Sequence, residues 1–390
     1  MHFTRRPKKF NMQATVRILK FKDGPVPVMR ILGIHLNSKL KWGPHVNLTA
    51  AKAASHMASI TRLTKSTWGA TFAKARQIYA AVVRPVLAYG CPVWFSLGDE
   101  RANRNRLIYP LQTVQNKCLR TITGAYKTIQ VLEHEASVAP LDLHLEMQAI
   151  NRVLRTEDSA GSQVVGETCK AIDQRAQRRF RTKGNIPARH IDQFRTRAES
   201  MQQQSYLTGP DRGRSKTATK RELEETWKAR WTKYQQQTRA MANDNKLSVA
   251  ARATWTRGLR TKESLTRAES TVATLLRTER IGLNDYLYRR RVPGYAEPDC
   301  GCGWPRQTLK HIILFCPAHS TGRAEMLLEA KTTDYIKLLS TETGLRAVTK
   351  WFLQRDVLTQ FSLARTMDDA KPRRRGRRPG TYMDEDDGDR

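Results

Sequence analysis

The chain has few cysteines, no long hydrophobic run and few acidic residues, and each shortage excludes a class of protein. Six cysteines in 390 residues are too few for a disulfide-stapled secreted protein. No run of about 18 apolar residues occurs, so the sequence predicts no membrane-spanning helix. The first ten residues, MHFTRRPKKF, lack the apolar stretch of a secretory signal peptide. We therefore expect a nuclear or cytoplasmic protein with no membrane partner.

The shortage of acidic residues leaves a large positive charge. The chain has 69 lysines and arginines against 36 aspartates and glutamates, a formal net charge of +33. An excess of this size favours a polyanionic partner, because phosphate contacts release counterions from nucleic acid. We expect RNA, DNA or both to bind, largely without sequence preference. A basic surface that is merely solvated is the alternative.

Hydrophobic periodicity predicts a mainly α-helical fold with a short N-terminal β element. Residues 1–40 contain VPVMRILGIHL after the turn signal KDGP, a pattern typical of strands. Apolar residues then recur at steps of three and four, as on one face of a helix. Helices are expected at 46–63, 72–86, 107–122, about 141–155, and 263–290. Pro85 is expected to kink or end the second helix, and residues 89–94 to form a strand or turn.

Three of the six cysteines and one histidine lie together near residue 300. Their spacing is Cys300-x-Cys302-x8-His311-x4-Cys316, with glycines beside the first pair. A structural zinc ion takes four sulfur or nitrogen ligands in a tetrahedron, usually as two pairs brought together by a turn. The sequence therefore predicts a structural zinc site, with no open position for catalysis.

Two alternatives remain open for this stretch. It also fits a glycine-rich turn before an amphipathic helix, in which Cys316 would be a small buried hydrophobe. The apolar face of that helix would be Leu309, Ile312, Ile313 and Phe315. Asp299 and His319 lie close enough in sequence to replace one misassigned ligand.

Four blocks follow one another in a distinctive order. They are RILGIHLNSKLKWGPHV at 30–46, YAAVVRPVLAYGCPVW at 79–94, LQTVQNKCLRTITGAYKT at 111–128, and the stretch from RTERIGLNDYLY to HIILFC at 277–316. In this order they resemble the C-terminal half of a non-LTR (LINE-type) retrotransposon reverse transcriptase, closest to fungal elements. The first resembles the region after the polymerase palm, the next two the thumb, and the last the zinc-binding module.

The resemblance and the changes in composition together suggest five segments. They are a post-palm and thumb-like remnant at 1–155, a basic linker with exposed helices at 156–262, a zinc-binding module at 263–330, C-terminal helices at 331–365, and a disordered charged tail at 366–390. The predicted fold is thus a helical thumb-like domain followed by a small zinc-stabilised helical module.

The chain also departs from the family it resembles. Such polymerases hold two metal ions on palm carboxylates, typically in a Tyr-x-Asp-Asp hairpin. TYMDEDD near Tyr382 and TMDDAK near Asp368 lie in charged stretches without flanking apolar strands. No segment of 156–260 resembles the RNase H domain that family members often carry. We expect no catalytic residue here, magnesium and RNA-directed DNA polymerase activity only within a longer chain, and Met1 as an internal methionine of a longer ancestor.

Basic residues on the expected helices are candidates for phosphate contacts, as the resemblance to a thumb implies. They are Lys52, Arg62, Lys65, Lys117, Arg120, Arg289, Arg290 and Arg291. Near the zinc module, Arg277, Arg280, Arg306 and Lys310 are expected to extend the basic surface. Trp304 and Tyr295 are expected either to stack on unpaired bases or to fill the core of the knuckle.

The segment KPRRRGRRPG concentrates five arginines near the C-terminus. These are Arg373, Arg374, Arg375, Arg377 and Arg378. The segment resembles an AT-hook, which lies in a narrow minor groove. It fits a nuclear localisation signal or a solvated basic run equally well.

Two functional hypotheses follow from the sequence. The first is a retrotransposon-derived reverse transcriptase fragment that binds RNA or DNA through the thumb-like domain and the Cys/His module. The alternative is a host basic nucleic-acid-binding or chromatin-binding protein without catalytic activity.

Overall fold

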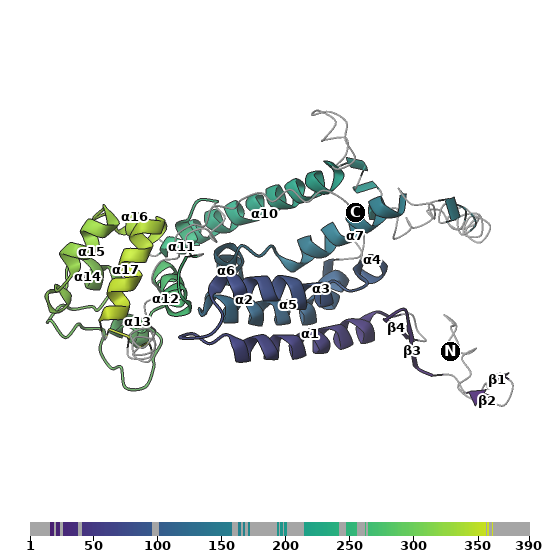
Figure 1. Ribbon diagram of the computed structural model, residues 1–390, viewed down its shortest axis with the longest axis horizontal. Helices are drawn as coiled ribbons and strands as arrows, with labels where there is room; N and C mark the ends of the chain where they lie inside the picture. Colours follow the sequence, from purple (N-terminus) through teal and green to yellow (C-terminus); the bar gives the residue numbers. More distant parts are fainter. Residues whose placement is uncertain are drawn as a thin grey trace, which may run out of the picture.

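A computed structural model describes much of the chain between residues 16 and 361. The described residues are 16–18, 21–23, 26–37, 41–95, 101–157, a few positions between 163 and 200, 214–241, 247–255, 262, 264–355, 357, 358 and 361. Helices dominate them, with two short β-hairpins near the N-terminus (Figure 1). The mainly α-helical fold class is therefore confirmed. The tail at 366–390 lies outside the described residues.

The N-terminal β element consists of two separate two-stranded antiparallel hairpins. The strands are β1 (Val16–Ile18) with β2 (Phe21–Asp23), and β3 (Val28–Ile31) with β4 (Ile34–Asn37). Leu32 and Gly33 turn the second hairpin with φ of 48° and 79°, a region that glycine adopts without steric cost. The Tyr89 hydroxyl donates to the Leu32 carbonyl at 3.0 Å, which ties this hairpin to the helices.

The apolar stripe expected from residue 46 builds the first long helix. Helix α1 spans Gly43–Leu63 and buries Val46, Ala50, Ala53 and Ile60. It packs along α5 (Arg101–Thr123), and the two lie side by side in Figure 1. The stripe ends before Leu63, whose side chain is 58% exposed.

The helix expected over 72–86 forms with an interruption. Helix α2 (Phe72–Ile78) runs into a π-helical turn at Tyr79–Val83, and α3 (Arg84–Leu87) follows. Pro85 has no N–H to donate, and it lies in the first turn of α3, where a missing donor costs nothing. The predicted interruption therefore falls just before Pro85.

Residues 89–94 form a turn and then a short helix, so a strand at this place is a wrong expectation. Gly90 adopts a φ of 65° and precedes α4 (Cys91–Trp94). A side chain at Gly90 would approach the Ile34 side chain to 3.2 Å. Glycine is therefore needed both for the turn and for the close approach of β4.

Helix α6 has no counterpart among the predicted elements. It spans Ile129–Ala136, between α5 and α7 (Leu141–Glu157). Its last six residues are all buried, including the polar Glu133, His134 and Glu135. Periodicity misses such a helix because its buried face carries charges rather than apolar side chains.

Helix α10 packs against α7, as Figure 1 shows. It spans Arg214–Met241, and its Trp231 is 2% exposed. The Trp231 ring stacks on His134 with centroids 4.3 Å apart, and its indole N–H donates to the Ala253 carbonyl at 3.2 Å. One face of α10 therefore belongs to a packed body, while the division of the chain into segments stays a prediction.

Helix α12 (Arg267–Thr278) lies at the centre of the fold. It contacts α2, α5, α11 (Val249–Arg252), α16 (Tyr335–Ser340) and α17 (Glu342–Gln354). Its N-terminus is a capping box: the Thr266 hydroxyl accepts from the Glu269 N–H at 3.3 Å, and the Glu269 carboxylate accepts from the Thr266 N–H at 2.8 Å. The helical run expected over 263–290 is thus two helices, since α13 begins anew at Asn284 and ends at Arg289.

The C-terminal helices gather at one end of the molecule in Figure 1. They are α14 (Leu309–Leu314), α15 (Arg323–Ala330), α16 (Tyr335–Ser340) and α17 (Glu342–Gln354). Their buried apolar side chains join those of the N-terminal helices in one continuous core that runs from Val46 to Phe361. Among the described residues, no helix is long and apolar enough to cross a membrane.

Glu133 is a buried carboxyl without a cationic hydrogen-bond partner among the described residues. It is 5% exposed and accepts from the Gln115 amide at 3.4 Å. Burial, reinforced by the charge of Asp142, raises its pKa to about 8. The folded protein therefore keeps a proton that the unfolded chain releases near pH 4.5.

Glu133→Gln is expected to flatten the fall in stability with rising pH. Because the folded state binds the extra proton, wild-type stability should fall between about pH 4.5 and pH 8, by at most about 1.4 kcal/mol per pH unit. Urea unfolding at pH 5, 7 and 9 measures the difference between variant and wild type. Glu225→Gln, on an exposed face of α10, is the matched control. Equal pH dependence of both variants would contradict the assignment.

Candidate metal centre

The four residues predicted as zinc ligands come together. One ligand atom from each of Cys300, Cys302, His311 and Cys316 lies within 4.8 Å of all the others. The Cys300 and Cys316 sulfurs are 3.7 Å apart, far beyond the roughly 2.05 Å of a disulfide. The Cys302 sulfur and His311 Nε2 are 3.2 Å apart. These residues lie close enough to hold a metal ion.

These two separations fit a tetrahedral ion of zinc's size. Zinc–sulfur bonds of about 2.3 Å place two thiolates about 3.8 Å apart at tetrahedral angles, and a thiolate and an imidazole nitrogen about 3.6 Å apart. The observed sulfur–sulfur distance of 3.7 Å and sulfur–nitrogen distance of 3.2 Å are close to these two values. The arrangement is compatible with a structural zinc site that has four protein ligands. Asp299 and His319, the alternative ligands, are not members of the cluster.

Local backbone geometry forms the first half of the centre. The Cys300 N–H donates to the Trp304 carbonyl at 2.8 Å, and the Gly303 N–H donates to the Cys300 carbonyl at 2.8 Å. Gly303 closes this turn with a φ of 88°, which a residue with a Cβ adopts only with strain. The turn aims the sulfurs of Cys300 and Cys302 at the same point.

The start of α14 forms the second half. The Thr308 hydroxyl accepts from the His311 N–H at 3.2 Å and so caps the helix. His311 lies in the first turn of α14. The Cys316 N–H donates to the His311 carbonyl at 2.8 Å. The helix end therefore carries the second ligand pair. The amphipathic face is real as well, since Leu309, Ile312 and Ile313 are buried, but Phe315 is 61% exposed.

Side chains outside the cluster hold both halves in place. The Asn284 amide donates to the Asp299 carbonyl at 2.9 Å, and the Asn284 N–H donates to the Gln307 side chain at 2.8 Å. Arg323 donates to the carbonyls of Ile312 at 3.2 Å, Cys316, and His319 at 3.1 Å. Sequence reasoning missed these supports, because each joins residues without a recognisable pattern.

The Cys300 thiol has to lose a proton before it can bind a metal ion. Burial raises the pKa of Cys300 to about 11, so its thiol is protonated at neutral pH in the absence of a cation. A bound metal ion would hold the thiolate instead, and metal binding would release protons.

Trp304 covers one ligand from the solvent side. Its ring stacks on His311 with centroids 5.3 Å apart and an angle of 9° between the planes. The indole is 56% exposed, so it is not a core residue of the knuckle, and neither is Tyr295, at 41% exposed.

The predicted phosphate-contact residues lie mostly on the surface. Lys52, Arg62, Lys65, Lys117, Arg290 and Arg291 are exposed, and Arg120 is half-buried. Arg289 is exposed but pairs with Asp285, which also accepts from Arg306 at 2.6 Å. The i,i+4 spacing of Asp285 and Arg289 is the one signal of this pair in the sequence. Arg373, Arg374, Arg375, Arg377 and Arg378, and the acidic segments near Tyr382 and Asp368, lie outside the described residues.

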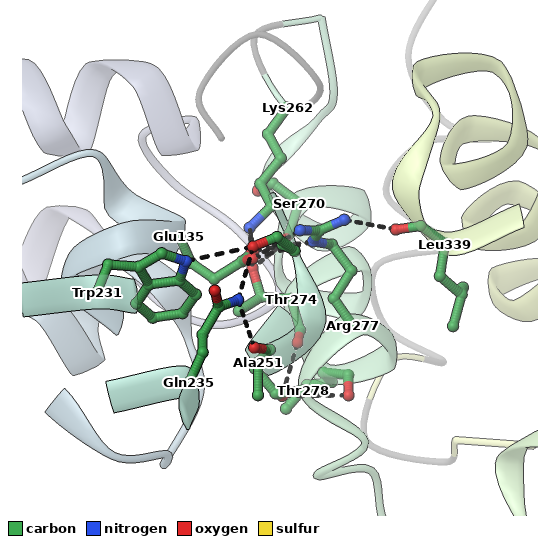
Figure 2. Close-up of polar contacts among 12 residues, drawn as sticks. Glu135, Trp231, Gln235, Ala251, Lys262, Ser270, Thr274, Arg277, Thr278 and Leu339 are labelled. Atoms are coloured by element: carbon green, nitrogen blue, oxygen red, sulfur yellow. Dashed lines mark hydrogen bonds and ion pairs between the residues drawn. The ribbon is translucent and has the colours of Figure 1, made fainter. Parts of the chain in front are cut away.

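Arg277 is buried, so its predicted place on the basic surface is wrong. Figure 2 shows its guanidinium against Glu135, with Lys262 on the same carboxylate. The Lys262 ammonium lies 2.5 Å from Glu135 Oε2, and Arg277 donates to Glu135 Oε1 at 2.8 Å and to the Leu339 carbonyl at 2.6 Å. Although burial opposes the charged form, the two cations hold the pKa of Glu135 well below its usual range.

Comparisons with known proteins find partial likeness to proteins of transposable elements. The chain is 26% identical over 129 residues to a putative 115 kDa protein in the type-1 retrotransposable element R1DM of Drosophila melanogaster, which covers 32% of this chain and 12% of that protein. It is 29% identical over 94 residues to a probable RNA-directed DNA polymerase from transposon BS of the same organism, which covers 24% of this chain and 10% of that protein.

No family model matches the chain, and no solved structure matches it. The matched regions span 12% and 10% of the two curated relatives. Fold and site together define a mostly helical protein with a candidate Cys/His metal centre. The partial likenesses support a retrotransposon origin for this chain. Its assignment to fungal elements stays a prediction.

Proposed function

We propose that this chain is a fragment of a non-LTR retrotransposon reverse transcriptase. It binds RNA or DNA through its helical body, the thumb-like segment within 1–155, and through its Cys/His module at 263–330. The likeness to a transposon-encoded RNA-directed DNA polymerase carries the proposal. Polymerase activity, with magnesium, would belong to a longer chain only. The ion in the Cys/His cluster would be zinc, in a structural role.

The distribution of charge supports nucleic-acid binding. The chain carries a formal net charge of +33. Helix α1 turns Lys52 and Arg62 to solvent, while its apolar stripe faces the core. Lys117 is likewise exposed on α5, and Arg120 is half-buried one turn further along. Cations presented on one side of packed helices suit contacts to phosphates, which position a nucleic acid without reading its sequence.

Binding of a labelled RNA or DNA oligonucleotide is expected to weaken steeply with salt. Three phosphate contacts to a single strand would lower the affinity about tenfold or more between 50 and 200 mM salt. Fluorescence anisotropy across that range measures the slope of log affinity against log salt. An affinity independent of salt would contradict the proposal, because screening must weaken contacts to phosphates.

A host basic nucleic-acid-binding or chromatin-binding protein would give the same salt dependence. The reading frame upstream of Met1 separates the two functions. A frame that continues into a Tyr-x-Asp-Asp segment would favour the reverse transcriptase, and a stop codon or an unrelated promoter there would favour the host protein. In either case no primer extension is expected from this chain alone, since it contains no recognisable polymerase carboxylates.

A further inference from the structure

Cations from two distant parts of the sequence meet where the α5–α6 loop reaches the end of α12. The Lys127 ammonium, in the loop, donates to the carbonyl of Thr278, the last residue of α12, at 3.3 Å. Arg280 follows two residues later, and Arg290 stands at the end of α13. The charges of Arg280 and Arg290 both act on Lys127, so the α5–α6 loop and the ends of α12 and α13 contribute cations to one place.

The positive charge at this junction is only partly balanced. Burial, together with the nearby charges of Arg280 and Arg290, lowers the pKa of Lys127 to about 8, although the charge of Glu279 opposes the shift. The Glu279 carboxylate already accepts from the Tyr335 hydroxyl at 3.1 Å. No ion pair within the described residues neutralises Arg280 or Arg290. The guanidinium of Arg290 lies over the Tyr286 ring, 5.6 Å from its centroid, and Arg290 is an exposed residue.

Exposed aromatic residues neighbour these cations in the sequence. Tyr126 immediately precedes Lys127 and is 74% exposed. Tyr288, on α13, is 44% exposed. An aromatic ring that the fold leaves in water is available to stack on the face of an unpaired base, whichever base it is. A duplex offers no such face, because its bases are stacked on one another.

We propose that this junction, formed by Tyr126, Lys127, Arg280, Tyr288 and Arg290, binds single-stranded nucleic acid. The arginines contact phosphates and the tyrosines stack on bases. The inference rests on the proposed function of nucleic-acid binding and names the class of ligand and the place. Lys127 positions the loop through its bond to α12 and adds to the local potential.

The test measures binding of the full chain to labelled oligonucleotides of one sequence as single-stranded RNA, single-stranded DNA and duplex DNA. The double variant Arg280→Gln/Arg290→Gln is expected to weaken single-strand binding about fivefold per lost contact at about 0.1 M salt, since each contact contributes about 0.7 to the salt slope. Tyr126→Ala is expected to weaken single-strand binding about fivefold or more and to leave duplex binding unchanged.

Lys220→Gln/Lys228→Gln is the control that removes the same number of charges as the double variant, since both lysines are exposed on α10. It is expected to leave the affinity unchanged. Circular dichroism and thermal melting of every variant confirm that it is folded. These substitutions spare Lys127, whose loss would leave the Thr278 carbonyl without its donor.

Separate outcomes overturn the two proposals. If both junction variants bind as tightly as the wild type, and the wild type still binds in a salt-dependent way, the binding site at the junction is overturned. The proposed function is then unaffected. An equal loss of duplex binding in Tyr126→Ala would overturn the single-strand assignment. Absence of salt-dependent binding in the wild type would overturn the proposed function. Selective loss of binding to either RNA or DNA single strands supports the junction.

Discussion

Cys316→Ser is expected to abolish stoichiometric zinc binding and to lower the stability of the whole chain. Cys316 is fully buried, and its sulfur faces Cys300 at 3.7 Å. A ligand that binds only the folded state stabilises it by about 3 kcal/mol when free ligand is about a hundredfold above its Kd. Because the module shares one core with the N-terminal helices, the loss should appear in global unfolding.

Zinc content by elemental analysis and thermal unfolding measure this prediction. Removal of zinc from the wild type with a chelator should lower its unfolding midpoint to near that of the variant. Cys118→Ala is the control, since Cys118 is buried outside the cluster. It should keep one zinc ion per chain and cost about 1 kcal/mol for the small cavity. Full zinc content in Cys316→Ser would favour the other interpretation, a turn before an ordinary amphipathic helix.

Glu135→Gln is expected to destabilise the fold by about 3–5 kcal/mol, because it leaves two buried cations uncompensated. Lys262 is 0% and Arg277 5% exposed. Both cations are buried in the folded protein, and both donate hydrogen bonds to this one carboxylate. The cluster also joins α6 to α12 and, through the Leu339 carbonyl, to α16 (Figure 2).

Urea unfolding at pH 7 measures the effect, with Glu342→Gln as the matched control. Glu342 pairs with Arg346 at 3.3 Å on the surface, where both side chains are about half exposed. Loss of that pair should cost about 0.5 kcal/mol or less. Because the pKa of Glu135 is depressed, its carboxylate contributes its full stabilisation at any pH above the ordinary glutamate pKa of 4.5. That stabilisation is lost only as the pH falls below 4.5. Equal stability of the two variants would contradict a buried ion cluster.

Local patterns predicted the features that depend on neighbours in sequence. The stripe of α1 and the cluster of Cys300 and Cys316 both follow from spacing over short distances. The backbone geometry of a helix or a turn is set within a few residues, so such spacing translates directly into a shared face or a shared point. The same reasoning placed the interruption before Pro85.

The features that the sequence did not reveal depend on partners far along the chain. From the sequence, Arg277 was expected on the surface. Its carboxylate partner, Glu135, lies 142 residues earlier in the sequence, so no local pattern connects the two. Helix α6 was missed for the same reason, because its buried Glu135 looks polar until Lys262 and Arg277 are placed beside it. Lys127 meets α12 across 151 residues.

The sequence by itself determined the helical character, the excess positive charge and the four residues of the candidate metal centre. Each of these is a property of composition or of short-range spacing. Only the tertiary structure decided which cations are buried and which face solvent, and that the α5–α6 loop lies against α12. The physical reason is that a charge enters the core where packing supplies a counter-charge or hydrogen-bond acceptors for it, and packing is a property of the whole chain.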